Sequence, residues 1–167
     1  MVAKEAGEML YLKRKIDAFL AEWKANPDRK PLIVKGPRQV GKTESIKRFG
    51  EMNYQSVITI NFVEEPKYKM ITADGYRADD IIKNISRMDP SKRFIEGETL
   101  IFFDELQEFP EIATALKFFK IDGRFDVICS GSMLGINYRK IESNSVGSVY
   151  YTHLDVYKRQ GHTAEGG

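Results

Sequence analysis

Residues 36–43 restrict the possible folds of this chain more than any other segment. They read Gly-Pro-Arg-Gln-Val-Gly-Lys-Thr and match the pattern GxxxxGK[ST] at every fixed position. The short apolar run 32–34 before them predicts a buried strand, and the pattern of residues 42–48 predicts a helix. This pattern binds phosphate when it lies between a strand and a helix, so the sequence predicts a phosphate-binding loop here.

Each residue type in this loop has a physical role. The glycines allow backbone N–H groups to curl around phosphate, and the helix that follows offers the positive end of its dipole. Lys42 can reach the β- and γ-phosphates of a nucleotide, and the hydroxyl of Thr43 can ligate Mg²⁺. The predicted nucleotide-binding residues are Gly36, Pro37, Arg38, Gln39, Val40, Gly41, Lys42, Thr43 and Glu44.

An acidic pair follows a second apolar run. Residues 99–103 predict a strand that ends at Asp104 and Glu105, and parallel sheets bind ligands at the carboxyl ends of their strands. We expect Asp104 to bind Mg²⁺ through water, and Glu105 to orient or deprotonate a water molecule in line with the γ-phosphate. Acidic pairs also end strands simply where a chain emerges into solvent, and this alternative stays open.

Ser130 is a further candidate because it follows the apolar run 126–129, which predicts another strand. A hydroxyl at that point can hydrogen-bond the attacking water or the γ-phosphate. Small polar residues such as Ser130, Gly131 and Ser132 also form ordinary turns, so both interpretations stand.

Predicted strands and helices alternate along the whole chain. Helical patterns occur at residues 9–25, at residues 77–88 and from Pro110 onward, and a further strand is predicted at residues 57–62. This alternation predicts a three-layer α/β fold with a parallel central sheet. We assign residues 1–30 to an N-terminal helix that leads into the core and residues 31–148 to the nucleotide-binding domain.

Composition excludes several other classes of protein. With 26 Lys and Arg against 24 Asp and Glu, the net charge of +2 does not predict a dedicated nucleic-acid binder. No apolar run approaches the roughly 20 residues of a membrane span. Because both histidines lie in the last fifteen residues and Cys129 is the single cysteine, the domain body cannot hold a Ser-His-Asp triad or a zinc site. A lone cysteine is also typical of a cytoplasmic protein.

Three segments together resemble one family, namely residues 36–43, residues 102–107 (Phe-Phe-Asp-Glu-Leu-Gln) and residues 130–135 (Ser-Gly-Ser-Met-Leu-Gly). They are similar to prokaryotic AAA-superfamily ATPases whose AAA domain precedes a C-terminal domain of unknown function. The resemblance covers residues 11–147. It implies the additional-strand branch of the phosphate-loop NTPase fold, ATP with Mg²⁺ as the nucleotide, and a sensor role for Ser130.

The resemblance also implies parts that this sequence lacks. In the family, the segment that contains Ser130 is followed by more of the ATPase domain, a lid-like region and the second domain, so the domain is expected to be incomplete at its C-terminal end. Arg139 lies at a suitable distance beyond Ser130 for an arginine finger, although a solvated helix residue is the alternative. An active site completed by a neighbour, in a homo-oligomer or with a protein partner, would fit this family.

Residues 149–167 depart from the pattern of the domain. Residues 151–160 (Tyr-Thr-His-Leu-Asp-Val-Tyr-Lys-Arg-Gln) resemble the translation of paired transposon-end adapters used in sequencing-library preparation. We therefore interpret the segment as non-native and exclude it from the fold prediction. Genomic DNA amplified without transposon-based preparation would contradict this interpretation if it encodes the segment after Ser148.

Three functions remain open on the sequence alone. The domain can hydrolyse Mg-ATP and couple the state of the nucleotide to a missing C-terminal domain or partner. It can instead be a nucleotide-gated binding switch with little turnover. A kinase is the third alternative, but Glu105 disfavours it because a residue that orients water is a liability in a kinase.

Overall fold

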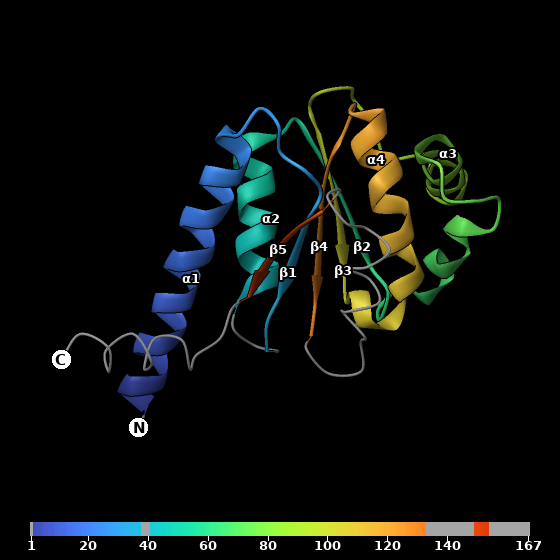
Figure 1. Cartoon of the computed structure of the whole chain (residues 1–167). Coiled ribbons are helices and arrows are strands. Elements are labelled where there is room, and N and C mark those ends of the chain that lie inside the picture. Colours follow the sequence, from blue (N-terminus) through green and yellow to red (C-terminus); the bar gives the residue numbers. More distant parts are fainter. Residues whose placement is uncertain (1, 38–40, 133–148, 154–167) are drawn as a thin grey trace.

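The computed structural model describes residues 2–37, 41–132 and 149–153, and these form an α/β fold around a parallel sheet (Figure 1). Its strands lie side by side in the order β2-β3-β4-β1-β5, and every neighbouring pair is parallel. The strands are β1 (Leu32–Lys35), β2 (Ser56–Asn61), β3 (Thr99–Asp104), β4 (Asp126–Gly131) and β5 (Tyr150–His153). The predicted three-layer α/β fold with a parallel central sheet is confirmed.

Helices cover both faces of this sheet. The first helices, α1 (Val2–Ala25) and α2 (Lys42–Asn53), lie on one face, and α3 (Ala78–Met88) and α4 (Leu116–Asp122) lie on the other (Figure 1). Side chains of a strand alternate between the two faces. In β3, for example, Leu100 and Phe102 belong to the core beneath α1 and α2, whereas Ile101 and Phe103 belong to the opposite core. Burial on both faces explains why the strands read as continuous apolar runs.

The N-terminal helix packs against the sheet through one stripe of apolar side chains. Leu12, Ile16, Leu20 and Trp23 follow helical spacing and are buried. The helix is longer than predicted because it begins at Val2 rather than near residue 9. Its first turns are exposed, so they carry no apolar periodicity by which a sequence could reveal them. None of the helices in the described part of the chain is both long enough and apolar enough to span a membrane.

The segment that starts at Pro110 differs from the continuous helix that was predicted. It forms the 3₁₀-helix η3 (Pro110–Ala115), and only then the α-helix α4. A 3₁₀-helix has three residues per turn, so Ile112 and Ala115 share one face, and both are fully buried. The prediction that Ile112, Leu116 and Phe119 face inward is confirmed.

The strand β5 lies within the segment that the sequence analysis excluded from the fold. It pairs with β1, and Tyr150 N donates a hydrogen bond to Pro31 O at 2.9 Å. No strand is predicted for these residues from the sequence. The interpretation of residues 149–167 as a non-native segment, and with it the division into residues 1–30, 31–148 and 149–167, stays a prediction.

Because the strands are parallel, their carboxyl ends meet at one edge of the sheet. Lys35, Asp104 and Gly131 are the last residues of β1, β3 and β4. The loop after β1 and the short 3₁₀-helix η2 (Leu106–Glu108) after β3 both leave the sheet at this edge. The fold therefore brings together the segments in which the sequence predicts phosphate and metal ligands.

Candidate functional site

A cavity of about 280 Å³ lies at the carboxyl edge of the sheet. Its lining combines residues of the glycine-rich segment with the end of β3 and the end of β4. These residues are Gly41, Lys42, Thr43, Glu44, Asp104, Glu105 and Gly131. The structure thus brings six of the predicted site residues to one cavity, whereas Gly36, Pro37 and Ser130 are described but are not among its lining residues. Arg38, Gln39, Val40 and Arg139 lie outside the described residues, as do residues 133–135 of the third family segment.

Gly41 is the point at which the loop turns into α2. Its φ of 81° lies in the left-handed region, which a glycine adopts without the steric cost that a side chain would bring. The carbonyl of Gly41 accepts a hydrogen bond from Ser45 N at 3.0 Å and so begins the helical ladder. Lys42 and Thr43 consequently occupy the first turn of α2, where backbone N–H groups have no helical partner and carry the positive end of the dipole.

Two backbone carbonyls of the loop hold the ammonium group of Lys42 by hydrogen bonds. Lys42 Nζ donates to Gly36 O at 2.9 Å and to Pro37 O at 3.2 Å, and only 9% of the residue is exposed. These carbonyls hold the charge of a long side chain at the wall of the cavity. A fixed positive charge beside a helix N-terminus is a suitable environment for phosphate.

Thr43 and Asp104 contact each other directly. Thr43 Oγ1 donates a hydrogen bond of 2.8 Å to Asp104 Oδ2, and Glu105 N donates one of 2.9 Å to Asp104 Oδ1. Burial raises the pKa of Asp104, while the hydrogen bonds from Thr43 and from the Glu105 backbone oppose this shift. A hydroxyl and a carboxylate side by side are oxygen ligands of the kind that Mg²⁺ prefers, so these residues fit the predicted ion.

Glu105 has a backbone conformation that residues other than glycine rarely adopt. Its φ is 59° and its ψ is 50°, and among the residues that the structure describes it is the one non-glycine residue with a positive φ. Such a conformation costs about 1–3 kcal/mol and persists where the surroundings enforce it. The turn directs the chain into η2 while Glu105 stays at the cavity wall.

Gln107 contacts Glu105, and the sequence alone predicts no role for it. Gln107 Nε2 donates a hydrogen bond to Glu105 Oε2, and Gln107 Oε1 accepts one from Ser132 N at 3.1 Å. The signal in the sequence was an amide two positions after the glutamate, but the spacing does not reveal that the amide also reaches the end of β4.

Ser130 lies inside β4, one residue before its end, and is fully buried. Its Oγ has no hydrogen-bond partner in the described part of the chain, and Ser45 Oγ of α2 is the other buried hydroxyl in this state. A buried hydroxyl without a partner costs about 1–3 kcal/mol. A polar atom of this kind calls for an explanation, such as a ligand or water that would engage it.

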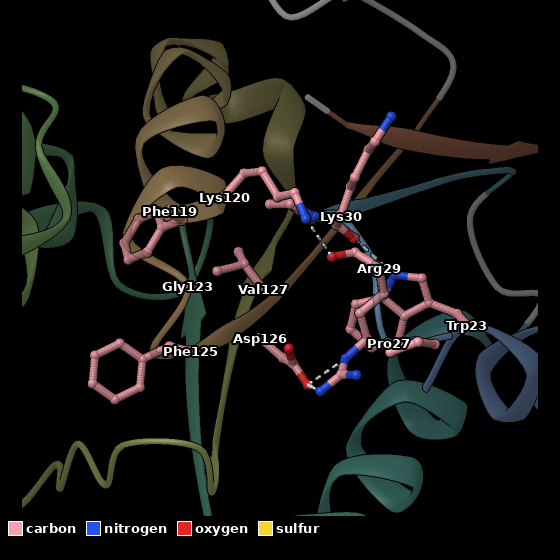
Figure 2. Close-up of a pocket in the computed structure, with 11 residues that line it drawn as sticks. Trp23, Pro27, Arg29, Lys30, Phe119, Lys120, Gly123, Phe125, Asp126 and Val127 are labelled. Carbon is pink, nitrogen blue, oxygen red and sulfur yellow. Dashed lines mark hydrogen bonds and ion pairs between the residues drawn. The ribbon is translucent and has the colours of Figure 1, made fainter. Parts of the chain in front are cut away.

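A second pocket, of about 190 Å³, lies at the opposite edge of the sheet, where β4 begins (Figure 2). The acidic residue in its lining is Asp126. Asp126 Oδ2 accepts hydrogen bonds from Arg29 Nε at 2.9 Å and from Tyr54 OH at 2.6 Å, and Lys24 Nζ lies 3.5 Å away. Figure 2 shows the guanidinium of Arg29 facing this carboxylate. Arg29 and Asp126 of this pocket therefore pair with each other, and Lys24 of α1 and Tyr54, which follows α2, contact the same carboxylate at the start of β4.

Comparison with known proteins gives a family and a fold. The profile of the AAA domain family matches residues 28–158, which is most of the chain. A comparison with curated proteins finds no match.

Similar solved structures include a chain of PCH-2 from C. elegans, with 13% identity, a TM-score of 0.50, and coverage of 85% of this chain and 42% of that one. A chain in the structure of Drosophila ORC bound to AT-rich DNA and Cdc6 has 10% identity and a TM-score of 0.59, with coverage of 92% and 59%. A chain of Drosophila ORC bound to DNA has 10% identity and a TM-score of 0.55, with coverage of 87% and 93%. The chain spans about half the length of the first two.

These similarities support the phosphate-loop NTPase fold, and the family match extends from before the glycine-rich loop to beyond β5. The chain belongs to the AAA domain family.

Proposed function

We propose that this AAA domain binds Mg-ATP in the cavity at the carboxyl edge of the sheet and hydrolyses it. The observation that carries the proposal is the hydrogen bond between Thr43 and Asp104, because it joins the glycine-rich motif to the acidic motif at one cavity. Membership of the AAA domain family supports nucleotide binding, and ATP in particular. The oxygen ligands at Thr43 and Asp104 support Mg²⁺ as the accompanying ion.

The loop and the first turn of α2 would bind the phosphates. The backbone N–H groups that begin α2, together with Lys42, would supply positive charge to the β- and γ-phosphates. Thr43 and Asp104 would hold Mg²⁺, which neutralises charge on the phosphate oxygens when it is bound. The transfer of a phosphoryl group to water needs little covalent chemistry from the protein, so positioned charges can supply most of the catalysis.

Glu105 would orient the attacking water and accept its proton. The water oxygen forms a bond to the γ-phosphorus, the bond from that phosphorus to the bridging oxygen breaks, and ADP and inorganic phosphate leave. Glu105 lines the cavity beside Lys42, Thr43 and Asp104, which supports this role. The partnerless hydroxyl of Ser130 lies on the neighbouring strand β4 and would hydrogen-bond the γ-phosphate or the water as a sensor.

The state of the nucleotide would be coupled to a further domain or partner, as in the prokaryotic ATPases that the sequence resembles. The chain spans 42% and 59% of two structurally similar chains and 93% of a third. We place it in the cytoplasm and expect a homo-oligomer or a protein partner that completes the active site. The net charge of +2 gives no support to nucleic-acid binding.

Glu105→Gln tests hydrolysis separately from binding. We expect phosphate release to fall by a factor of about 10²–10⁴, the usual contribution of a general base, while the affinity for Mg-ATP stays within twofold. Glu111→Gln is the matched control because Glu111 is exposed on η3, away from the cavity lining. Unchanged turnover in Glu105→Gln would contradict the proposal.

The same assay separates the alternatives. Binding of ATP to the wild-type protein without phosphate release would favour the nucleotide-gated switch. Labelled γ-phosphate on an acceptor, instead of free phosphate, would identify a kinase.

A further inference from the structure

We propose that Gln107 is a positioning residue that fixes the carboxylate of Glu105 at the cavity and links it to the end of β4. The inference rests on the proposed hydrolysis, in which Glu105 orients the attacking water. Gln107 would influence the rate of that step through Glu105, since Gln107 is not itself a lining residue of the described cavity.

The side chain of Gln107 uses both ends of its amide. Its Nε2 donates to Glu105 Oε2, and its Oε1 accepts from Ser132 N at 3.1 Å. An amide is one of the few uncharged side chains that can donate and accept at the same time, so the residue type matches the task. Replacement by an apolar side chain of similar length would remove both bonds. A carboxylate could keep only the bond from Ser132 N.

The contact restricts a side chain that is otherwise free to rotate. The Glu105 backbone is fixed by its left-handed turn and by the hydrogen bond from Glu105 N to Asp104 Oδ1. These interactions leave the rotations of the glutamate side chain unrestricted, and a glutamate has much rotamer freedom to lose. Glu105 lines the described cavity, whereas Gln107 does not. The amide of Gln107 therefore holds the carboxylate in place without lining the cavity itself.

The same amide joins two neighbouring strands. Glu105 directly follows β3 and Ser132 directly follows β4, and these strands are paired in the sheet. Ser130, the proposed sensor, lies in β4 two residues before Ser132. A shift of the end of β4 when Ser130 engages a phosphate would therefore be passed through Gln107 to the carboxylate of Glu105.

The local fold does not depend on this amide. Leu106 anchors η2 because it is fully buried. Backbone hydrogen bonds from Glu108 N to Glu105 O and from Phe109 N to Leu106 O, both of 3.0 Å, close its turns. Loss of the Gln107 amide should leave η2 in place and change the position of the carboxylate.

The test compares Gln107→Met and Gln107→Glu with the wild-type protein. We expect Gln107→Met to lower kcat by about 10-fold to 100-fold, the range for one lost hydrogen bond to a charged group, while KM, the Kd for Mg-ATP and the melting temperature stay near the wild-type values. Gln107→Glu keeps an acceptor for Ser132 N but cannot donate to Glu105, so its kcat should fall at least as far. Gln55→Met is the matched control, because Gln55 is exposed.

A double substitution tests whether Gln107 acts through Glu105. In single-turnover experiments, the double variant should be less than twofold slower than Glu105→Gln alone. A full additional loss in the double variant would overturn the inference.

The remaining outcomes separate this inference from the proposed function. Without phosphate release by the wild-type protein, the proposed hydrolysis fails and the role of Gln107 fails with it. With normal wild-type release and a Gln107→Met rate within twofold of Gln55→Met, only the role of Gln107 is overturned. A Gln107→Met variant in which nucleotide affinity and melting temperature fall together with the rate would show a merely structural role. This result would overturn the inference as well.

Discussion

Thr43 Oγ1 donates a hydrogen bond of 2.8 Å to Asp104 Oδ2, although the two residues are 61 positions apart in the chain. They do not come from neighbouring strands. Thr43 follows β1 and Asp104 ends β3, and β4 lies between these strands in the sheet. The bond joins the first turn of α2 to the end of β3, and Gly131 at the end of β4 lines the same cavity. The two motifs are thus brought together although β4 separates their strands in the sheet.

Thr43→Val should lower the stability of the nucleotide-free protein. The substitution keeps the shape of the side chain but removes the hydroxyl, so the buried carboxylate of Asp104 loses a donor. We expect the free energy of unfolding to fall by about 1.5–3 kcal/mol, the range for a hydrogen bond to a charged group. Urea denaturation without nucleotide measures this change. Thr43→Ser keeps a hydroxyl and is the control, and equal losses in both variants would contradict the importance of the bond.

Ser130→Ala should have opposite effects on stability and on turnover. The variant removes a buried hydroxyl that lacks a partner, so we expect the free energy of unfolding to stay constant or to rise by about 1 kcal/mol. Loss of a sensor hydroxyl should lower phosphate release about 10-fold or more, since a hydrogen bond made in the transition state would be missing.

Ser45→Ala is the matched control for Ser130→Ala. Ser45 Oγ is the other partnerless buried hydroxyl. Neither serine is among the lining residues of the described cavity, but Ser130 lies at the carboxyl end of β4, whereas Ser45 lies in α2. Its substitution should raise stability similarly and leave turnover unchanged. Equal turnover in Ser130→Ala and Ser45→Ala would exclude the sensor role.

Tyr54 should give the protein a measurable dependence on alkaline pH. Burial, followed by the hydrogen bond to Asp126, raises the pKa of Tyr54 above its ordinary value of 10.0. The unfolded chain therefore loses this proton at a lower pH than the folded protein does. Tyr54 contributes its full stability below about pH 10, and the contribution declines as the pH rises further.

Tyr54→Phe tests this dependence. At neutral pH the variant should lose about 1.5–3 kcal/mol of unfolding free energy, because the hydrogen bond from Tyr54 OH to Asp126 is absent. Between about pH 9 and about pH 11 its stability should decline less steeply than that of the wild-type protein. Tyr76→Phe serves as a control at a partly buried tyrosine. Parallel pH curves for Tyr54→Phe and the wild-type protein would contradict the account.

The glycine-rich motif and the acidic pair made the sheet and the cavity predictable from sequence. A strand, a loop and a helix in that order fix where residues 36–43 lie, and the apolar runs before Asp104 and Ser130 mark strands that are buried on both faces. Parallel strands then bring these ends to one edge without further information.

Features that depend on three-dimensional packing were not predictable in this way. The first turns of α1 have no apolar stripe, and the choice of 3₁₀ geometry after Pro110 depends on how Ile112 and Ala115 pack beneath it. The bonds of Gln107 connect the ends of two strands, and no periodicity in the sequence records such a contact.

The most direct test of the account is titration calorimetry with Mg-ATP on the wild-type protein and Lys42→Ala. Lys47→Ala serves as the control, since Lys47 is an exposed lysine of the same helix. Lys42 holds its charge at the wall of the cavity, so we expect Lys42→Ala to weaken binding by about 100-fold or more, equivalent to about 2.7 kcal/mol, while Lys47→Ala binds like the wild-type protein. Absence of binding to the wild-type protein, or equal affinities for the wild-type protein and Lys42→Ala, would contradict the assignment of this cavity as the nucleotide site.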